Sequence, residues 1–219
     1  QERFKKEKEV DFAFGFKDRL RFRTNVYVQK GFVSAALRLI SYKIKTLEEL
    51  RLPKVLRDFT RPSQGFVLVT GPTGHGKSTT LAALIDEINH TRGDHIVTIE
   101  DPIEYVFTPD KAMIEQREVG IDTLNFDRAL RSVFRQDANV VMLGEMRDRE
   151  TISTAVTVAE TGHLVFATLH TNSASQTINR IIDIFPSEQQ SQIRLQLAGA
   201  LLGIVSQRLI PRIKGGFIP

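Results

Sequence analysis

One eight-residue segment constrains the fold of this chain more than any other. Residues 71–78 satisfy the pattern G-x-x-x-x-G-K-[ST] at every fixed position. An apolar, strand-like stretch (66–70) precedes the segment, and a helical pattern (77–91) follows it. Glycines let the backbone bend so that successive N–H groups point at phosphate oxygens, and the helix adds its positive N-terminal end. The segment therefore predicts a phosphate-binding loop between a strand and a helix.

The positions of this loop predict a nucleotide site that uses ATP and Mg²⁺. Lys77 is expected to bring a positive charge to the β and γ phosphates, and the Ser78 hydroxyl is placed to bind magnesium. The predicted nucleotide-binding residues of the loop are Gly71, Thr73, Gly74, His75, Gly76, Lys77, Ser78 and Thr79.

After the loop, strand-like and helix-like segments alternate, which is the pattern of a parallel α/β sheet. Strands are expected at 66–70, 95–99, 140–143 and 164–169. Helices are expected at 77–91, 125–135, 149–161, 174–184 and 187–209.

Polar residues suited to phosphoryl chemistry follow the predicted strands. In open parallel sheets, ligands bind beyond the carboxyl ends of the strands. Glu145 follows an apolar strand, as does the magnesium-holding acid of many nucleotide hydrolases. Glu104 or Glu100 could orient and deprotonate the attacking water. His163 and His170 bracket the last predicted strand, and a terminal histidine can sense the γ phosphate.

The first sixty residues have a different pattern. Alternating apolar residues predict strands at 10–16 and 20–28, and 32–40 could be a third. Thr46 and Glu49 form a capping box that predicts a short helix running up to residue 53, and a second helix could follow through residue 57. So small an antiparallel sheet has little core of its own, so the chain is expected to begin in mid-domain. The expected division is a partial domain at 1–60, a linker at 61–65 and a second domain at 66–219.

Composition narrows the possible functions. The chain has no cysteine, which excludes disulfides and cysteine-ligated metal sites, and it has no apolar run long enough to span a membrane. Residues 1–61 carry a net charge of +8, whereas residues 62–219 carry −4. A basic first part indicates either a nucleic-acid surface or a domain that meets an anionic site.

Five motifs, in order along the chain, resemble those of the type II/IV secretion ATPase superfamily, and most closely the type IV pilus retraction ATPases, the PilT family. The similarity spans most of residues 10–212. It includes the Walker A loop, the Asp-box 98–105 (TIEDPIEY), the segment 116–120 (QREVG), the Walker B element 143–148 (LGEMRD) and the His-box 160–171 (ETGHLVFATLHT).

This resemblance implies an α/β fold: a RecA-like P-loop NTPase core with a parallel-rich sheet, preceded by a partial α+β, PAS-like N-terminal domain. It implies a cytoplasmic homohexameric motor that is peripheral to the membrane, acts on an inner-membrane pilus platform protein and makes no direct contact with nucleic acid. By similarity, Glu104 is the catalytic base, Glu145 the Walker B acid, and His163 and His170 the His-box pair. Three arginines of the first domain would reach nucleotide across the subunit interface: Arg21, Arg23 and Arg38.

The sequence departs from the family pattern in two places. His75 occupies a loop position that is usually held by a small residue, and it could crowd the phosphates. The chain also stops at Pro219, before the family's C-terminal helices, so the second domain is expected to be C-terminally truncated.

Three other functions remain open from the sequence. A pilus-assembly or type II secretion ATPase shares the superfamily, but such enzymes typically carry a tetracysteine zinc site, which this chain lacks. A nucleic-acid translocase would use the aromatic and basic residues of the first domain. A non-hydrolysing nucleotide switch is disfavoured because Glu104 and Glu145 are both present.

Overall fold

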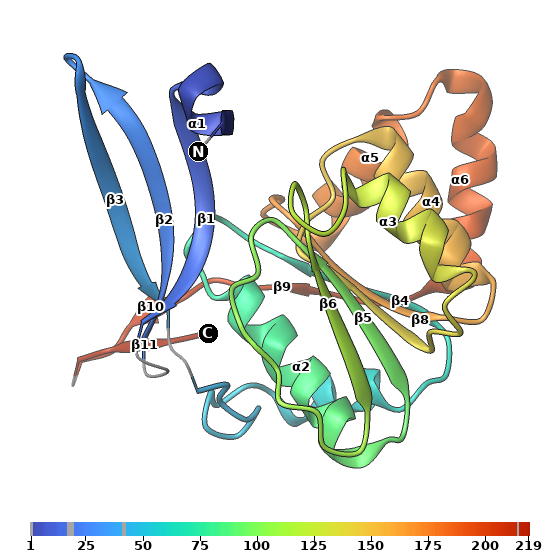
Figure 1. The fold of residues 1–219 in the computed structure, drawn as a ribbon. Helices are drawn as coiled ribbons and strands as arrows, with labels where there is room; N and C mark the ends of the chain where they lie inside the picture. The colour runs from blue at the N-terminus through green and yellow to red at the C-terminus, as the bar shows by residue number, and fades with distance from the viewer. Residues whose placement is uncertain (1, 17–19, 41–42, 214) are drawn as a thin grey trace.

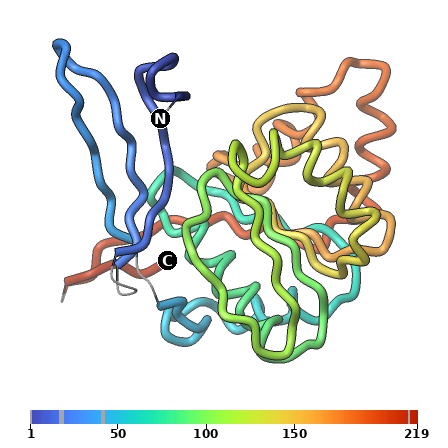
Figure 2. The backbone as a smooth tube through the Cα atoms, in the orientation of Figure 1, coloured from blue at the N-terminus to red at the C-terminus, as the bar shows by residue number. Residues whose placement is uncertain are grey.

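The computed structural model describes residues 2–16, 20–40, 43–213 and 215–219. A three-stranded antiparallel sheet stands to one side of a six-stranded parallel sheet that is covered by helices (Figures 1 and 2). The described part of the chain contains no helix long and apolar enough to cross a membrane.

The three-stranded sheet follows a short helix, α1 (Glu2–Glu7), and has the order β1-β2-β3. Its strands are β1 (Glu9–Phe16), β2 (Leu20–Gln29) and β3 (Phe32–Ile40), as the alternating pattern predicts. Phe14 pairs with Phe22 across β1 and β2, and their rings stack with centroids 5.5 Å apart. This sheet fits an N-terminal domain that packs beside the core.

The six-stranded sheet has the order β6-β5-β7-β8-β4-β9, and all of its neighbouring strands are parallel. Its strands are β4 (Gly65–Thr70), β5 (His95–Glu100), β6 (Met113–Glu118), β7 (Val140–Leu143), β8 (Leu164–Leu169) and β9 (Leu201–Ser206). The connecting helices are α2 (Lys77–Thr91), α3 (Phe126–Val133), α4 (Arg149–Glu160), α5 (Ala174–Asp183) and α6 (Ser187–Ala200). A small hairpin of β10 (Ile210–Pro211) and β11 (Phe217–Ile218) follows.

Alternating side chains of the central strands divide the core into two layers. Phe66 and Leu68 of β4 pack with α3, α4, α5 and α6, whereas Val67 and Val69 pack with α2. Strands buried on both faces are nearly continuous runs of apolar residues, which is why the sequence predicts β4, β5, β7 and β8 well. The α/β fold with a parallel-rich sheet is confirmed.

The predicted helix at 187–209 is wrong in its second half. α6 ends at Ala200, and the chain continues as β9, which pairs with the edge of β4. A Cβ atom at Gly203 would lie 2.5 Å from the Phe59 ring, so glycine lets β9 pass close to that ring. The pairing with β4 satisfies backbone groups that a longer helix would otherwise bond internally.

The predicted short helix before residue 53 is also wrong. The capping box forms, because the Glu49 N–H donates to the Thr46 hydroxyl and the Thr46 N–H donates to Glu49, but it closes only a turn. Arg51 has a left-handed φ of 58°, and Pro53 has no N–H to continue a helix. A 3₁₀ helix, η1 (Lys54–Thr60), follows instead.

The two-layer core predicts a large stability loss from one α2 substitution. Leu84 is fully buried, so Leu84→Ala should lower the free energy of unfolding by about 2–5 kcal/mol in urea titrations. Leu195→Ala is the matched control, because Leu195 is 76% exposed on α6 and should change stability by less than about 0.5 kcal/mol. Equal losses in the two variants would contradict this assignment of the core.

Candidate nucleotide site

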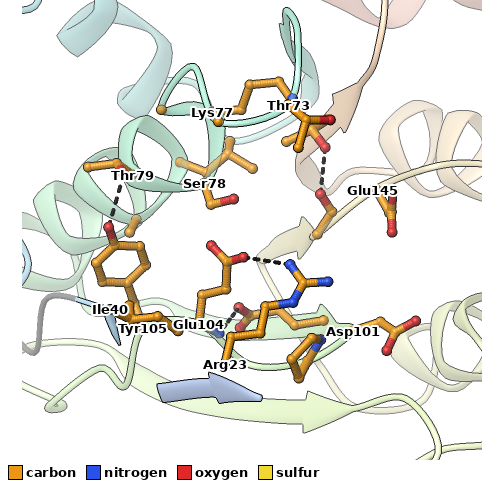
Figure 3. Close-up of a pocket in the computed structure, with 18 of the residues that line it drawn as sticks. Arg23, Ile40, Thr73, Lys77, Ser78, Thr79, Asp101, Glu104, Tyr105 and Glu145 are labelled. Carbon is orange, nitrogen blue, oxygen red and sulfur yellow. Dashed lines mark hydrogen bonds and ion pairs between the residues drawn. The ribbon is translucent and has the colours of Figure 1, made fainter. Parts of the chain in front are cut away.

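The candidate site is a cleft of about 510 Å³ at the carboxyl ends of β4, β5, β7 and β8. Residues from both sheets line it, including Arg23 and Arg38 of the N-terminal sheet. Figure 3 shows Lys77, Ser78, Glu104 and other polar side chains around the same space. Ligand sites typically enclose about 300–1,000 Å³, so the cleft can hold a molecule the size of a nucleotide.

The loop after β4 has the backbone that its glycines predict. Gly71, Gly74 and Gly76 have φ angles of 146°, 80° and 83°, which other residues rarely adopt. A Cβ atom at Gly74 would meet no neighbour within 4 Å. Gly76 caps α2, so the loop leads directly into a free helix N-terminus. This arrangement suits an anion at the end of α2.

Lys77 is held inside the loop by backbone carbonyls. Its Nζ donates to the carbonyl oxygens of Gly71, at 2.9 Å, and Pro72, at 3.0 Å. Burial lowers the pKa of the Lys77 ammonium, while Glu145 and Glu104 oppose this shift. The ammonium therefore lies where negative charge from phosphate would favour its protonated form.

His170 connects the loop to Glu145. Its Nδ1 lies 3.4 Å from Lys77 Nζ and 3.5 Å from the Thr73 hydroxyl, and its Nε2 lies 3.4 Å from Glu145. Glu145 also pairs with Arg147. The ends of β4, β7 and β8 thus meet through one imidazole ring.

Glu104 faces the cleft beside two arginines of β2. Arg23 Nη1 lies 3.1 Å from Glu104 Oε1, and Arg21 donates to the Ile103 carbonyl. Arg38 lines the cleft as well. In the single chain, the basic N-terminal sheet therefore already contacts the acidic loop of the same chain.

Glu100 is almost completely buried behind Glu104. It accepts hydrogen bonds from the Thr98 hydroxyl, the Gln116 amide and the Glu104 N–H. Burial, only partly offset by these hydrogen bonds, raises the pKa of Glu100 to about 7. Its carboxylate supports the backbone at Glu104 and lies at the inner wall of the cleft.

Four predicted site residues do not line the cleft: Arg21, Gly71, His75 and His163. His163 lies at the opposite end of β8, where its Nδ1 contacts the Val158 carbonyl and its ring packs against Phe134. The His75 ring turns away from the phosphate side, and its Nδ1 accepts the Leu209 N–H at 3.0 Å. Gly71 contributes its carbonyl to Lys77 rather than to the cleft wall. Arg21 lies directly against the loop that carries Glu104, and the other predicted residues line the cleft.

Sequence reasoning gave no role to two glutamines that hold the loops, the partly buried Gln116 and the buried Gln207. Gln116 of β6 bonds the Tyr105 carbonyl and the Phe107 N–H, and Gln207 bonds the phosphate loop. Gln116 lies within the segment 116–120 that resembles a family motif, whereas Gln207 lies outside the five motif segments, and nothing in the sequence shows which loop either side chain reaches.

The parallel sheet with a phosphate loop at its carboxyl edge defines a P-loop protein. The family model "Type II/IV secretion system protein" matches residues 15–215. The "Type IV pilus retractation ATPase PilT" of Pseudomonas aeruginosa is 50% identical over 208 residues, which are 95% of this chain and 60% of that protein. The "Twitching motility protein" of Neisseria gonorrhoeae is 48% identical over 202 residues, 92% of this chain and 54% of that protein.

A solved structure agrees with these relatives. The crystal structure of the pilus retraction motor PilT with bound ADP superposes with a TM-score of 0.95 and 52% identity, over 99% of this chain and 63% of that one. The chain belongs to the type II/IV secretion system protein family, within its PilT branch. It spans between 54% and 63% of the length of these three proteins.

The buried Glu100 predicts a pH-dependent stability. Its pKa is raised in the fold, so the folded chain binds more protons than the unfolded chain between pH 4.5 and about 7, and this group makes stability fall as pH rises through that window. In Glu100→Gln the contribution is absent. The unfolding free energy of the variant minus that of the parent should therefore rise with pH by up to about 3 kcal/mol and level off above pH 7.

Urea titrations at several pH values measure this difference. Leu195→Ala is the control, because it changes no titratable group and its difference from the parent should not vary with pH. A flat difference for Glu100→Gln would contradict the raised pKa.

Proposed function

We propose that this chain hydrolyses ATP and works as the motor part of a type IV pilus retraction machine. The observation that supports this most is the convergence of Lys77, Ser78, Glu104 and Glu145 on one cleft in a fold that superposes closely on ADP-bound PilT. A phosphate loop alone would serve a nucleotide switch equally well. Two carboxylates from different strands beside the loop favour hydrolysis.

In the proposed reaction, water attacks the γ phosphorus in line and ADP leaves. Glu104 accepts the proton of the water, and Lys77 stabilises the charge that develops on the phosphate oxygens. His170 contacts both Lys77 and Glu145, so it is the proposed relay between the γ phosphate and β8. Glu100 is proposed to support the catalytic loop, because it accepts the Glu104 N–H.

Mg²⁺, when bound with ATP, supplies positive charge to the phosphate oxygens. The hydroxyl of Ser78 and the carboxylate of Glu145 line the cleft and are oxygen donors of the type that Mg²⁺ prefers. Among the described residues, no cluster of three or more His, Asp or Glu side chains could hold a metal ion alone. Ser78 and Glu145 would hold the metal together with the nucleotide phosphates.

The proposed assembly is a homohexamer with nucleotide between neighbouring subunits. The basic N-terminal sheet and the acidic loop attract one another, and rotation of the sheet would move Arg23 relative to Glu104. His163 lies away from the cleft of its own chain, so any contact with nucleotide would have to be made to a neighbour's site.

We further propose the two-domain division at residues 61–65, a cytoplasmic location peripheral to the inner membrane, and a pilus platform protein as partner, without direct nucleic-acid contact.

Removal of the loop lysine should abolish nucleotide binding. Lys77→Ala is expected to weaken the binding of ADP by about 10²-fold or more, because a charge-assisted contact to phosphate is lost. Isothermal titration with ADP measures the affinity. Lys111→Ala removes an exposed lysine away from the cleft and should bind as the parent does. If Lys77→Ala bound ADP as tightly as the parent does, the loop would not be part of the nucleotide site.

Replacement of the proposed base should separate binding from turnover. Glu104→Gln is expected to bind ADP within a few-fold of the parent but to lower steady-state ATP turnover by about 10²–10⁴-fold, because proton abstraction is lost. Glu188→Gln on α6 is the control and should turn over normally. Masses in solution, with and without nucleotide, should show assembly in the parent and in both variants. If Glu104→Gln turned over ATP at the rate of the parent, Glu104 would not be the general base.

A further inference from the structure

We propose that Gln207 is a positioning residue that holds the phosphate loop in its binding conformation from the side opposite the cleft. This inference rests on the proposed nucleotide site. It assigns to the segment after β9 a part in nucleotide affinity.

Gln207 bonds the loop at three points along its length. Its backbone N–H donates to the Thr70 carbonyl at 2.8 Å, where β4 ends. Its side-chain Nε2 donates to the His75 carbonyl at 2.8 Å, and its Oε1 accepts the Thr80 hydroxyl at 2.7 Å. One residue therefore connects the start of the loop, its tip and the first turn of α2.

Gln207 also lies so close to the loop that side chains at positions 71 and 76 would meet it. A Cβ atom at Gly71 would overlap the Gln207 carbonyl oxygen, and one at Gly76 would lie 2.8 Å from Gln207 Nε2. The Gln207 backbone thus requires glycine at position 71, and a Cβ atom at position 76 would displace the Gln207 amide; both glycines also have positive φ angles. Gln207 is only 6% exposed and does not line the cleft, so it acts through the loop and not on the ligand.

Neighbouring residues of the same segment strengthen the connection. The Ser206 and Thr70 hydroxyls lie 3.1 Å apart, and Leu209 donates its N–H to His75 Nδ1. This bond directs the His75 ring toward the segment after β9, and the ring does not line the cleft.

The chemistry of the position requires an amide. The His75 carbonyl needs a donor and the Thr80 hydroxyl is bonded to an acceptor, and Gln offers both on one planar group. Glutamate would place a second oxygen against the His75 carbonyl, and methionine has a similar length but no strong donor or acceptor. A loop that is held in place before binding loses less freedom when phosphate arrives, which favours affinity.

Titration of ADP into the parent, Gln207→Met and Gln207→Glu tests the proposal. Both variants should bind ADP about tenfold more weakly than the parent, because the loop is no longer held. In ATPase assays, KM for ATP should rise by a similar factor while kcat changes less than about twofold, since Glu104 is untouched. Gln196→Met is the matched control, because the Gln196 side chain of α6 bonds Glu160 of α4 and does not line the cleft.

A double-mutant cycle distinguishes positioning from a general loss of stability. Thr80→Val should weaken ADP binding on its own but add little in the Gln207→Met background, because the shared bond is already lost. If Gln207→Met does not fold, the near-isosteric Thr80→Val decides alone. Parent-like ADP affinity in the folded variants would overturn the inference, whereas a parent chain that binds no ADP would refute the proposed function instead.

Discussion

The parallel register of the six-stranded sheet is the constraint on which the site depends. Because β4, β5, β7 and β8 run in the same direction and pair in register, their carboxyl ends finish at one edge. These ends carry the phosphate loop after β4, Glu100 at the last position of β5, Glu145 after β7 and His170 after β8. Lys77, Glu145 and His170 lie far apart in the sequence. In the fold, the His170 ring lies 3.4 Å from Lys77 Nζ and 3.4 Å from the Glu145 carboxylate.

Positively and negatively charged side chains alternate around that edge, and the phosphates of the proposed ligand would add negative charge beside Lys77. Lys77 is partly desolvated between loop carbonyls, and Glu104 and Glu145 supply the negative field that keeps an ammonium there favourable. Arg23 of the N-terminal sheet forms an ion pair with Glu104. A movement of the N-terminal sheet that separates Arg23 from Glu104 would cost part of this attraction, and a bound polyphosphate could replace it. Competition between Glu104 and a bound polyphosphate for Arg23 is therefore the proposed coupling between nucleotide and the position of the N-terminal sheet.

The central strands and helices could be predicted from the sequence because each is decided locally. β4, β7 and β8 are short apolar runs bounded by breakers, and α2 begins at the glycine of a recognisable loop. β6 and β9 could not be predicted. The first is half-exposed and reads Met-Ile-Glu-Gln-Arg-Glu, without an apolar run, and the second continues the apolar spacing of α6 across Ala200. Only the vacant edges of the sheet decide that these segments are strands. In the same way, motif resemblance placed Glu104 and Glu145 at the cleft, whereas the isolated position of His163 depends on strand direction in three dimensions.

The two strands of the six-stranded sheet that sequence reasoning missed, β6 and β9, are its two edges, and each supports one loop of the cleft. Gln116 and Glu118 of β6 bond the backbone at 103–107, so the loop that carries Glu104 is anchored to one edge. Gln207, at the end of β9, anchors the phosphate loop to the other. The central strands carry the proposed catalytic groups beyond their ends, but they have neighbours on both sides and no free flank. An edge strand has one free flank, and its polar side chains can turn over the end of the sheet to bond a loop. The phosphate loop and the loop that carries Glu104 are thus both supported from outside the cleft. This arrangement leaves the interior of the cleft open to the proposed nucleotide.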